Sequence, residues 1–229
     1  HIEGQVKRLD VIIALTHSTA HLQTGYGGAI KNIDMGLSGR GGKLDQHSGV
    51  KPELIASVCK ACEVCIIHCP AEAITLVNGK AHIDKDMCYG CGECFAVCPH
   101  SAVKVDKWHA TSDRMQAKMA LYCAGILANK KAGFINFATN ITKNCDCIDN
   151  PEKPLLPDVG ILASLDPVAI DTASIDLINQ KAGEVATESR LFRGKDIFRE
   201  VWPEIDYTIQ FKESEKLGVG SRKYIVENI

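Results

Sequence analysis

The chain has 229 residues, of which 45% are hydrophobic, and a formal net charge of -2 at pH 7. This length allows one large domain or two modest ones, and the hydrophobic fraction is ordinary for a packed globular protein. The small net charge gives no support for nucleic acid or an anionic membrane as a partner. No apolar run reaches the roughly 18 residues of a membrane-spanning helix.

The first predicted element is a buried strand, and a glycine-rich segment follows it. Residues 9–16 form a continuous apolar run, which predicts a strand buried on both faces of a parallel sheet. Residues 25–49 hold eight of the 19 glycines in the chain. Glycine lets backbone N–H groups approach a ligand, and open α/β sheets bind ligands at strand ends. We therefore predict a ligand-binding loop, with Gly25, Gly27 and Gly28 as cofactor-binding residues.

Basic side chains are interspersed among these glycines, so a phosphate-binding loop is the first possibility to test. Gly36 and Gly41 have the required spacing, but Gly42 stands where the lysine should be, and Leu44 follows Lys43 where Ser or Thr is expected. The motif is therefore absent. A solvated surface loop is the alternative to a binding loop. The basic residues of this region are His17, His21, Lys31, Arg40, Lys43 and His47.

The middle of the chain contains one cysteine pattern twice. Both copies read C-x2-C-x2-C-x3-C-P, the pattern of bacterial ferredoxins that hold two [4Fe-4S] clusters. Three thiolates of each run face one cluster, and the fourth cysteine ligates the other cluster. A structural zinc site would instead require two C-x2-C pairs around one tetrahedron, which fits this spacing poorly. The predicted ligand sets are Cys59, Cys62, Cys65 and Cys98 for one cluster, and Cys88, Cys91, Cys94 and Cys69 for the other.

Short strands complete a predicted ferredoxin-like module over residues 53–106. Asn78-Gly79 is a strong hairpin signal and joins strands expected over 73–77 and 81–84, and a further strand is expected over 102–105. Eight cysteines committed to clusters are consistent with a reducing, oxygen-poor cytoplasm, and a lumenal protein with disulfides is the alternative. His68 and His100 flank the cysteine runs and are interpreted as structural.

The remainder of the chain predicts helices alternating with strands, which implies a parallel α/β sheet. Asp166-Pro167 is a clear helix start, with Asp as the N-cap. Cys123 is interpreted as a packed core residue, whereas Cys145 and Cys147 are left with a metal, redox or structural role. The elements expected here are a helix over 112–129, strands over 133–139 and 159–164, a helix over 167–181 and a strand near 224–226.

The predicted fold class is therefore α/β, a parallel sheet with helices, into which an α+β ferredoxin-like domain with two [4Fe-4S] clusters is inserted. The α/β domain would consist of residues 1–52 and 107–229, and the inserted domain of residues 53–106.

These motifs together resemble a widespread prokaryotic family known as domain of unknown function 362. The resemblance covers nearly the whole chain and implies an architecture more than a reaction. It is carried by D-V-I-I-A-L-T-H ending at His17, H-x3-G-Y-G-G-A-I-K-N from His21, the double cysteine pattern, C-D-C from Cys145, and D-P-V-A-I-D from Asp166.

A second, local resemblance concerns residues 21–47, which are similar to the cofactor-holding segment of the nickel-pincer lactate racemases. In those enzymes a histidine is the acid or base, a lysine holds the cofactor and a later histidine ligates nickel. The resemblance implies these roles for His21, Lys31 and His47, which are the candidate catalytic residues. The racemases lack the cysteine-rich insert.

Three hypotheses follow. The first is an iron-sulfur oxidoreductase or electron-transfer protein, in which two [4Fe-4S] clusters supply low-potential electrons to a ligand in the glycine-rich loop. Its partner would be a redox protein or a small-molecule substrate, and a further metal or organic cofactor is left open. The second is a metal or nickel-pincer isomerase with structural or assembly clusters. The third is a non-catalytic iron-sulfur redox sensor.

Overall fold

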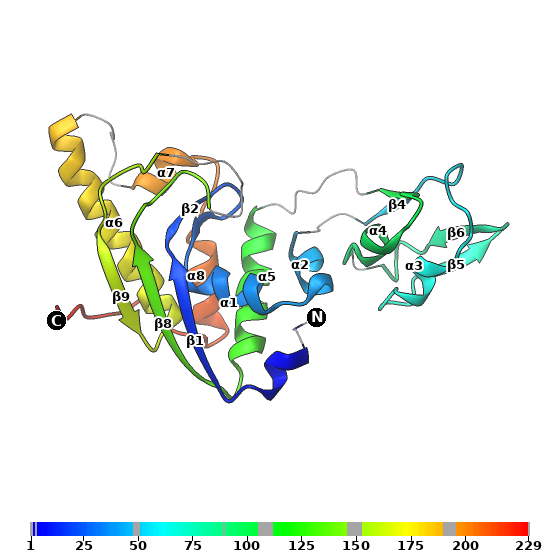
Figure 1. The fold of residues 1–229 in the computed structure, drawn as a ribbon, viewed down its shortest axis with the longest axis horizontal. Coiled ribbons are helices and arrows are strands. Elements are labelled where there is room, and N and C mark those ends of the chain that lie inside the picture. Colours follow the sequence, from blue (N-terminus) through cyan, green and yellow to red (C-terminus); the bar gives the residue numbers. More distant parts are fainter. Residues whose placement is uncertain are drawn as a thin grey trace. The chain divides into compact units, whose positions relative to one another are not determined.

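The structure is a computed structural model that describes residues 2, 4–47, 51–88, 90–104, 112–145, 153–189 and 196–228 (Figure 1). The chain divides into two compact units. The first unit covers residues 38–115, and the second covers residues 2–37 and 116–229. The first unit contains the whole predicted ferredoxin-like module and extends beyond it at both ends. No helix in the described ranges is long and apolar enough to cross a membrane.

The second unit is built on a three-stranded sheet in the order β1-β8-β9, formed by β1 (Val11–His17), β8 (Lys131–Ala138) and β9 (Gly160–Ser164). β1 and β8 run parallel, as predicted. β9 is antiparallel to β8, so the sheet is mixed and the purely parallel sheet expected from the sequence is wrong. Ala138 at the end of β8 pairs with Gly160 at the start of β9. The chain thus turns back at the same end of the sheet, which gives antiparallel strands.

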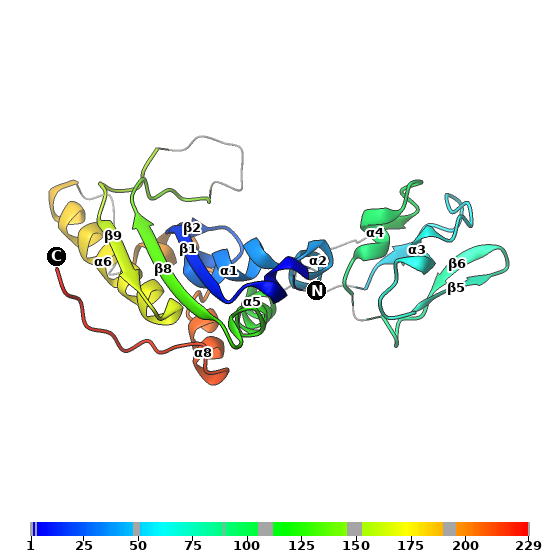
Figure 2. The ribbon, with the colours of Figure 1, turned by 60° about the horizontal axis from the view of Figure 1, so that its bottom comes forward.

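Helices pack against one face of this sheet (Figures 1 and 2). Their apolar side chains form one core with the strands, including Ile30 from α1, Phe134 from β8 and Ile178 from α6. A short ribbon of β2 (Thr19–His21) and β3 (Gly25–Gly27) follows β1 and leads into α1. The remaining elements of this unit are η1 (Gly4–Arg8), α1 (Ala29–Leu37), α5 (Ser112–Leu127, which begins in the first unit), α6 (Pro167–Ser189), α7 (Ile197–Val201) and α8 (Ile209–Lys216).

The other face of β1 is exposed, contrary to the prediction that this strand is buried on both faces. Val11, Ile13 and Leu15 retain 55%, 69% and 62% of their accessible surface, whereas Ile12 and Ala14 are buried. Side chains alternate between the two faces of a strand, so this pattern means that the described helices cover one face of β1. An uninterrupted apolar run was therefore misleading about the number of covered faces.

Helix α6 begins as predicted. The Oδ1 atom of Asp166 accepts hydrogen bonds from the backbone N–H groups of Val168 (2.8 Å) and Ala169 (2.9 Å), which makes it the N-cap. The helix continues to Ser189 instead of ending near residue 181. The strand predicted near residues 224–226 is absent from this described segment, where Tyr224 instead donates a hydrogen bond to Asp176.

The first unit contains two short antiparallel strand pairs and short helices. β5 (Ile74–Val77) and β6 (Lys80–Ile83) form the predicted hairpin, and both turn residues, Asn78 (φ 51°) and Gly79 (φ 69°), are left-handed as a type I′ turn requires. β4 (Glu53–Leu54) pairs with β7 (Val103–Lys104). The helices of this unit are α2 (Arg40–His47), α3 (Val64–Ile67) and α4 (Glu93–Val97).

Candidate functional site

The two cysteine runs follow the same backbone path. Left-handed residues occur at corresponding places in both runs, and the first run uses Ala61 and Glu63 where the second uses Gly90 and Gly92. Left-handed residues within a tight loop turn successive N–H groups toward one side, and such concavities bind anions, including iron-sulfur clusters. The corresponding pairs are Ala61 (φ 54°) with Gly90 (φ 80°), Glu63 (φ 62°) with Gly92 (φ 73°), and Glu72 (φ 50°) with Ser101 (φ 51°).

One cavity of the first unit, here called the first cysteine cavity, collects four cysteines. They are Cys59, Cys62, Cys65 and Cys98, the same four that the sequence pattern assigns to one cluster. The cavity contains about 330 Å³ of space not filled by atoms, part of it open to solvent. Leu54, Ala81 and Val103 form apolar walls, and Lys60, Glu63 and His100 also line it.

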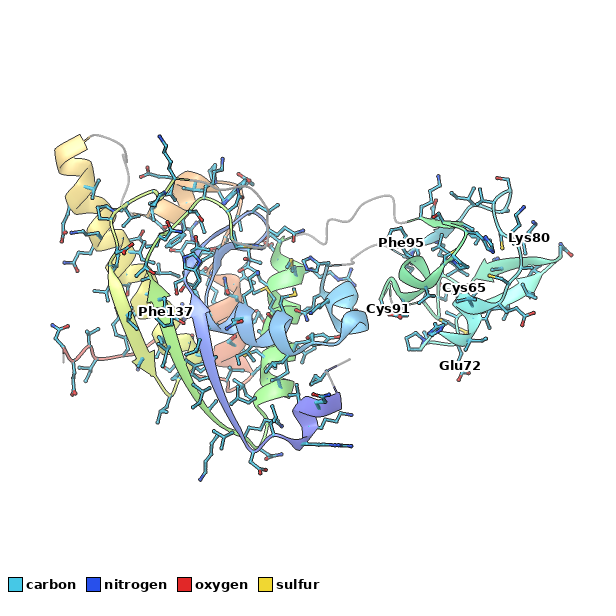
Figure 3. The ribbon with its side chains drawn as sticks, in the orientation of Figure 1. Cys65, Glu72, Lys80, Cys91, Phe95 and Phe137 are labelled. Atoms are coloured by element: carbon cyan, nitrogen blue, oxygen red, sulfur yellow. The ribbon has the colours of Figure 1, made fainter. Side chains whose placement is uncertain are left out.

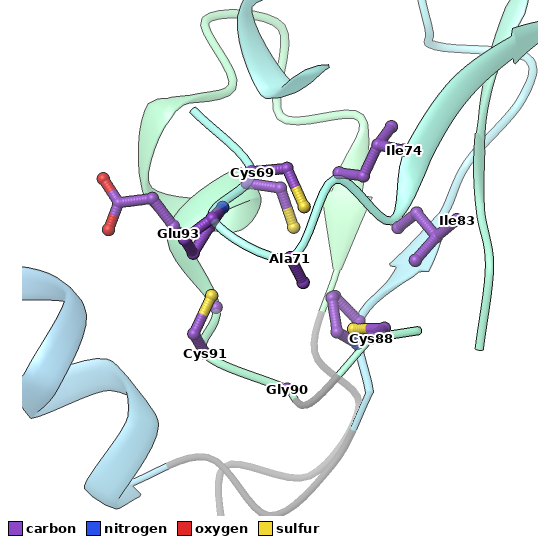
Figure 4. Close-up of a pocket in the computed structure, with 12 residues that line it drawn as sticks. Cys69, Ala71, Ile74, Ile83, Cys88, Gly90, Cys91 and Glu93 are labelled. Atoms are coloured by element: carbon purple, nitrogen blue, oxygen red, sulfur yellow. The ribbon is translucent and has the colours of Figure 1, made fainter. Parts of the chain in front are cut away.

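A second cysteine cavity collects the other four cysteines. Cys69 comes from the first run, whereas Cys88, Cys91 and Cys94 come from the second. Figure 4 shows the thiols of Cys69, Cys88 and Cys91 directed toward one another across this cavity, beside the apolar side chains of Ile74 and Ile83. The space not filled by atoms is about 310 Å³, including the part open to solvent.

Backbone N–H groups donate to several of the cysteine sulfurs. Such bonds stabilise a thiolate, because they place the positive end of an amide dipole at the charge. The N–H groups of Ala81 and Ala61 lower the pKa of the Cys59 thiol, and the nearby Lys80 ammonium adds to this effect. Such hydrogen bonds run from Ala61 N to Cys59 Sγ (3.5 Å), from Ala73 N to Cys69 Sγ (3.3 Å) and from Ala102 N to Cys98 Sγ (3.3 Å).

Within each cavity, a negative charge on one cysteine sulfur disfavours ionisation of the neighbouring thiols. Burial and, to a lesser extent, the neighbouring Cys91, Cys88 and Cys69 together raise the pKa of Cys94 to about 12. Burial likewise raises the pKa of Cys65, with contributions from Cys98, Cys59 and Cys62. Cys65 and Cys91 lie within the unit, whereas Glu72 lies at its surface (Figure 3). Four thiolates crowded in this way require cations between them.

In the part of the chain that the structure describes, no three His, Cys, Asp or Glu side chains are grouped so as to hold one metal ion. Sulfurs around a tetrahedral zinc ion would lie about 3.8 Å apart, given Zn–S bonds of about 2.3 Å. The cysteines instead line two cavities, with four thiols at each.

A third cavity, the Lys31 cavity, lies in the second unit, where β1 ends and α1 begins. This is the strand end at which the sequence predicted a ligand. The cavity holds about 570 Å³ of space not filled by atoms, including space open to solvent. Its lining residues are Leu15, Thr16, His17, Thr19, Gly27, Gly28, Lys31, Asn32 and Cys145.

The lysine that names this cavity lies on α1. Within the described ranges its ammonium forms no hydrogen bond and no ion pair. Burial lowers the pKa of Lys31, and the charge of Asp34, one turn further along the helix, opposes that shift. A Cβ atom at Gly27 would lie 3.3 Å from Cδ of Lys31, so this glycine leaves room for the lysine stem.

Gly28 serves a contact that the sequence did not reveal. A Cβ atom there would lie 2.2 Å from Oδ1 of Asp171. The Asp171 carboxylate accepts hydrogen bonds from the N–H groups of Ala29 (2.6 Å) and Ile30 (3.0 Å) in the first turn of α1, and from Asn136 Nδ2 (2.8 Å). Asp171, which lies on α6, therefore supplies the hydrogen-bond acceptor for these N–H groups in the first turn of α1. The signal for this role was the final aspartate of D-P-V-A-I-D, an acid within an apolar stretch of helix.

Gly25 does not line the Lys31 cavity, although it was grouped with Gly27 and Gly28 as cofactor-binding. It has φ of 71°, and a Cβ atom there would lie 3.0 Å from Cβ of Tyr207. Glycine is required at this position by the left-handed turn and by close packing.

The histidines of this region differ in their surroundings. His17 lines the Lys31 cavity, and its Nε2 donates to the carbonyl oxygen of Thr139 (2.7 Å), which leaves Nδ1 as the acceptor of the neutral ring. His21 is buried, and its Nδ1 accepts from the N–H groups of Gln23 and Thr24 (both 3.2 Å). The neutral His21 ring therefore carries its proton on Nε2, as a donor. His17 is one of the basic residues of this region in the sequence, but only His21 and His47 were counted among the candidate catalytic histidines.

His21 lies on the same face of the β2–β3 ribbon as Thr19, which lines the cavity. His47 ends α2 in the first unit, and the structure defines no geometry between it and His21 or Lys31. Cys145 is disulfide-bonded and lines the Lys31 cavity, and Cys147 lies outside the described residues. Cys123 is buried in the core, as predicted.

A family model described as "Domain of unknown function (DUF362)" matches residues 1–176. The chain belongs to the DUF362 family. The matched region contains both cysteine runs, Lys31 and Asp171, so every cavity described above lies largely within the DUF362 domain. No curated protein matches the chain. The resemblance to the nickel-pincer racemases is not shown by these comparisons.

Proposed function

We propose that this DUF362 protein is an iron-sulfur protein that carries two [4Fe-4S] clusters for low-potential electron transfer. The supporting observation is the exchange of cysteines between the two runs. Each cysteine cavity contains three cysteines of one run and the last cysteine of the other. Two-cluster ferredoxins share their ligands in this way.

The donor set and its surroundings fit the clusters. Each cavity offers four thiols, the ligands that [4Fe-4S] clusters take, and backbone N–H groups that donate to the sulfurs. Apolar walls such as Ile74 and Ile83 limit water at the second cavity, which helps to set a low potential. When bound, such clusters exchange single electrons, at about -400 mV in plant-type ferredoxins.

We further propose that the electrons serve a redox reaction on a ligand in the Lys31 cavity. Lys31 would bind this ligand, and the ring of His17, which also lines the cavity, would accept a proton from it or return one. Cluster ligation requires the eight cysteines of the two cysteine cavities as thiolates, which a reducing compartment would preserve. We accordingly propose a cytoplasmic location and a redox protein as the electron donor or acceptor.

Anaerobic purification or reconstitution, followed by iron, sulfide and nickel analysis, tests the cluster proposal. We expect about eight irons and eight sulfides per chain and no nickel, with a visible absorbance that dithionite bleaches reversibly. Cys123→Ala, which removes a buried thiol outside both cavities, should keep both clusters. Protein reconstituted without retaining iron would refute the proposal, and stoichiometric nickel would favour the isomerase hypothesis.

The ligand exchange has its own test by EPR spectroscopy of the reduced protein. Cys62→Ala should lose one cluster signal and Cys91→Ala the other. Cys98 belongs to the same run as Cys91, not to the run of Cys62. Cys98→Ala should nevertheless lose the same signal as Cys62→Ala, because Cys62 and Cys98 line one cavity. Loss of the Cys91-dependent signal in Cys98→Ala would show that each run holds its own cluster.

A further inference from the structure

The charges around the Lys31 cavity restrict what it can bind. Among the residues that the structure describes, its lining contains one lysine and no aspartate or glutamate. In the described part of the chain the ammonium of Lys31 has no hydrogen-bonding partner. A partly buried cation without a counterion is unfavourable, and an anion that enters the cavity would offset that cost.

Asp34 lies one turn from Lys31 on α1 but does not line the cavity. Its side chain is fully buried, and its Oδ2 atom has no hydrogen-bonding partner within the described residues. Burial raises the pKa of Asp34 well above its usual value, and the charge of Lys31 opposes that shift. A ligand in the cavity would therefore meet the ammonium of Lys31 and not the carboxyl group of Asp34.

The first turn of α1 is not available to an anion, because Asp171 occupies it. Asp171 accepts from the N–H groups of Ala29 and Ile30. A hydroxyl donor is present instead. Thr16 Oγ1 accepts from Asn32 Nδ2 (2.9 Å), so its own proton can be donated to a ligand.

We propose that the Lys31 cavity binds a compact oxyanion, either a carboxylate or a phosphate, through the ammonium of Lys31 and the hydroxyl of Thr16. The cavity is partly open to solvent, so a small anion can enter it. That this anion is a redox substrate rests on the proposed function. Binding itself does not require the clusters.

Isothermal titration calorimetry of the full chain, purified anaerobically, tests this inference with acetate and inorganic phosphate as separate probes. We expect one of them to bind with one-to-one stoichiometry, and which one binds distinguishes a carboxylate from a phosphate ligand. Lys31→Met should weaken binding at least tenfold, and Lys31→Arg should retain it better than Lys31→Met. Lys130→Met is the matched control, because Lys130 is half-buried and lies outside the cavity, and it should bind like the wild type.

The pH dependence gives an independent readout. Affinity should fall as the pH rises through the pKa of Lys31, which burial places below 10.5, and this decline should be absent in Lys31→Met. Equal binding by Lys31→Met and the wild type would reveal an adventitious ion only, and no binding of either probe would also overturn the inference. Iron analysis of the same samples separates the two proposals: iron-replete protein that binds neither anion refutes only the oxyanion site, and iron-free protein with Lys31-dependent binding refutes only the clusters.

Discussion

Asp171 is a single residue on which the wall of the Lys31 cavity depends. Its carboxylate is fully buried and joins α6 to the first turn of α1 and to β8 through hydrogen bonds. Burial raises the pKa of Asp171 from 3.8 to about 6, and the hydrogen bonds from Ile30, Asn136 and Ala29 partly oppose that shift. Tyr26 and Cys123, the titratable neighbours, have pKa values raised well above their usual ones and stay neutral in this pH range.

This shift predicts a pH dependence of stability. The pKa of Asp171 is higher in the folded protein than in the unfolded chain, so its contribution is fully present below about pH 4 and is lost as the pH rises through about 6. Relative to Asp171→Asn, the wild type should lose up to about 3 kcal/mol of unfolding free energy over this interval, at about 1.4 kcal/mol per pKa unit. Urea unfolding of both proteins at several pH values measures the difference. Parallel pH profiles would contradict the assignment.

At the scale of elements, the two cysteine loops show how one geometry is reached with different residues. The second loop places glycine at both left-handed positions, Gly90 and Gly92, whereas the first places Ala61 and Glu63 there. A left-handed conformation costs a residue with a Cβ atom roughly 1–2 kcal/mol. The backbone conformation of the first loop is therefore less favourable than that of the second, although both loops follow the same path.

Gly92→Ala should consequently destabilise the first unit by about 1 kcal/mol, because alanine is strained at φ of 73°. The matched control is Gly183→Ala within α6, where a Cβ atom meets nothing within 4 Å. That change should stabilise the protein by about 0.5–1 kcal/mol, since alanine favours a helix interior. Thermal unfolding followed by circular dichroism shows whether each variant lowers or raises the melting temperature. Two shifts in the same direction would argue against the left-handed backbone at Gly92.

At the scale of the whole molecule, a cysteine-rich unit and an α/β unit are built from different stabilising contacts. The core of the first unit includes Cys59, Cys65 and Cys94 among its few apolar residues. Cluster binding would therefore contribute to its folding, as metal binding does in other small domains. The second unit has a conventional apolar core between its helices and one face of its sheet.

The exposed face of β1 gives a prediction at this scale. Ile12→Ala should cost about 2–5 kcal/mol of stability, because it removes buried methyl groups and leaves a cavity. Ile13→Ala, next to it in the sequence, should cost less than about 1 kcal/mol, because Ile13 retains 69% of its accessible surface. Urea unfolding of the two variants provides the comparison. Similar losses would indicate that both faces of β1 are covered in solution.

The sequence by itself determined the features that depend on neighbouring residues. Asn78-Gly79 predicted its hairpin because both residues tolerate left-handed φ, and Asp166-Pro167 predicted its helix start because an N-cap acts within three residues. The cysteine spacing predicted which four side chains share each cavity, since the pattern itself encodes the path of both loops.

Only the tertiary structure decided the features that depend on contacts across the chain. His17 is oriented by the carbonyl of Thr139, and Asp171 reaches the N–H groups of Ala29 and Ile30, so neither role is visible in the local sequence. The direction of β9 and the exposed face of β1 likewise follow from where distant segments pack. Burial and hydrogen bonding are set by whichever groups meet in space, and residues more than a hundred positions apart meet only after the chain has folded.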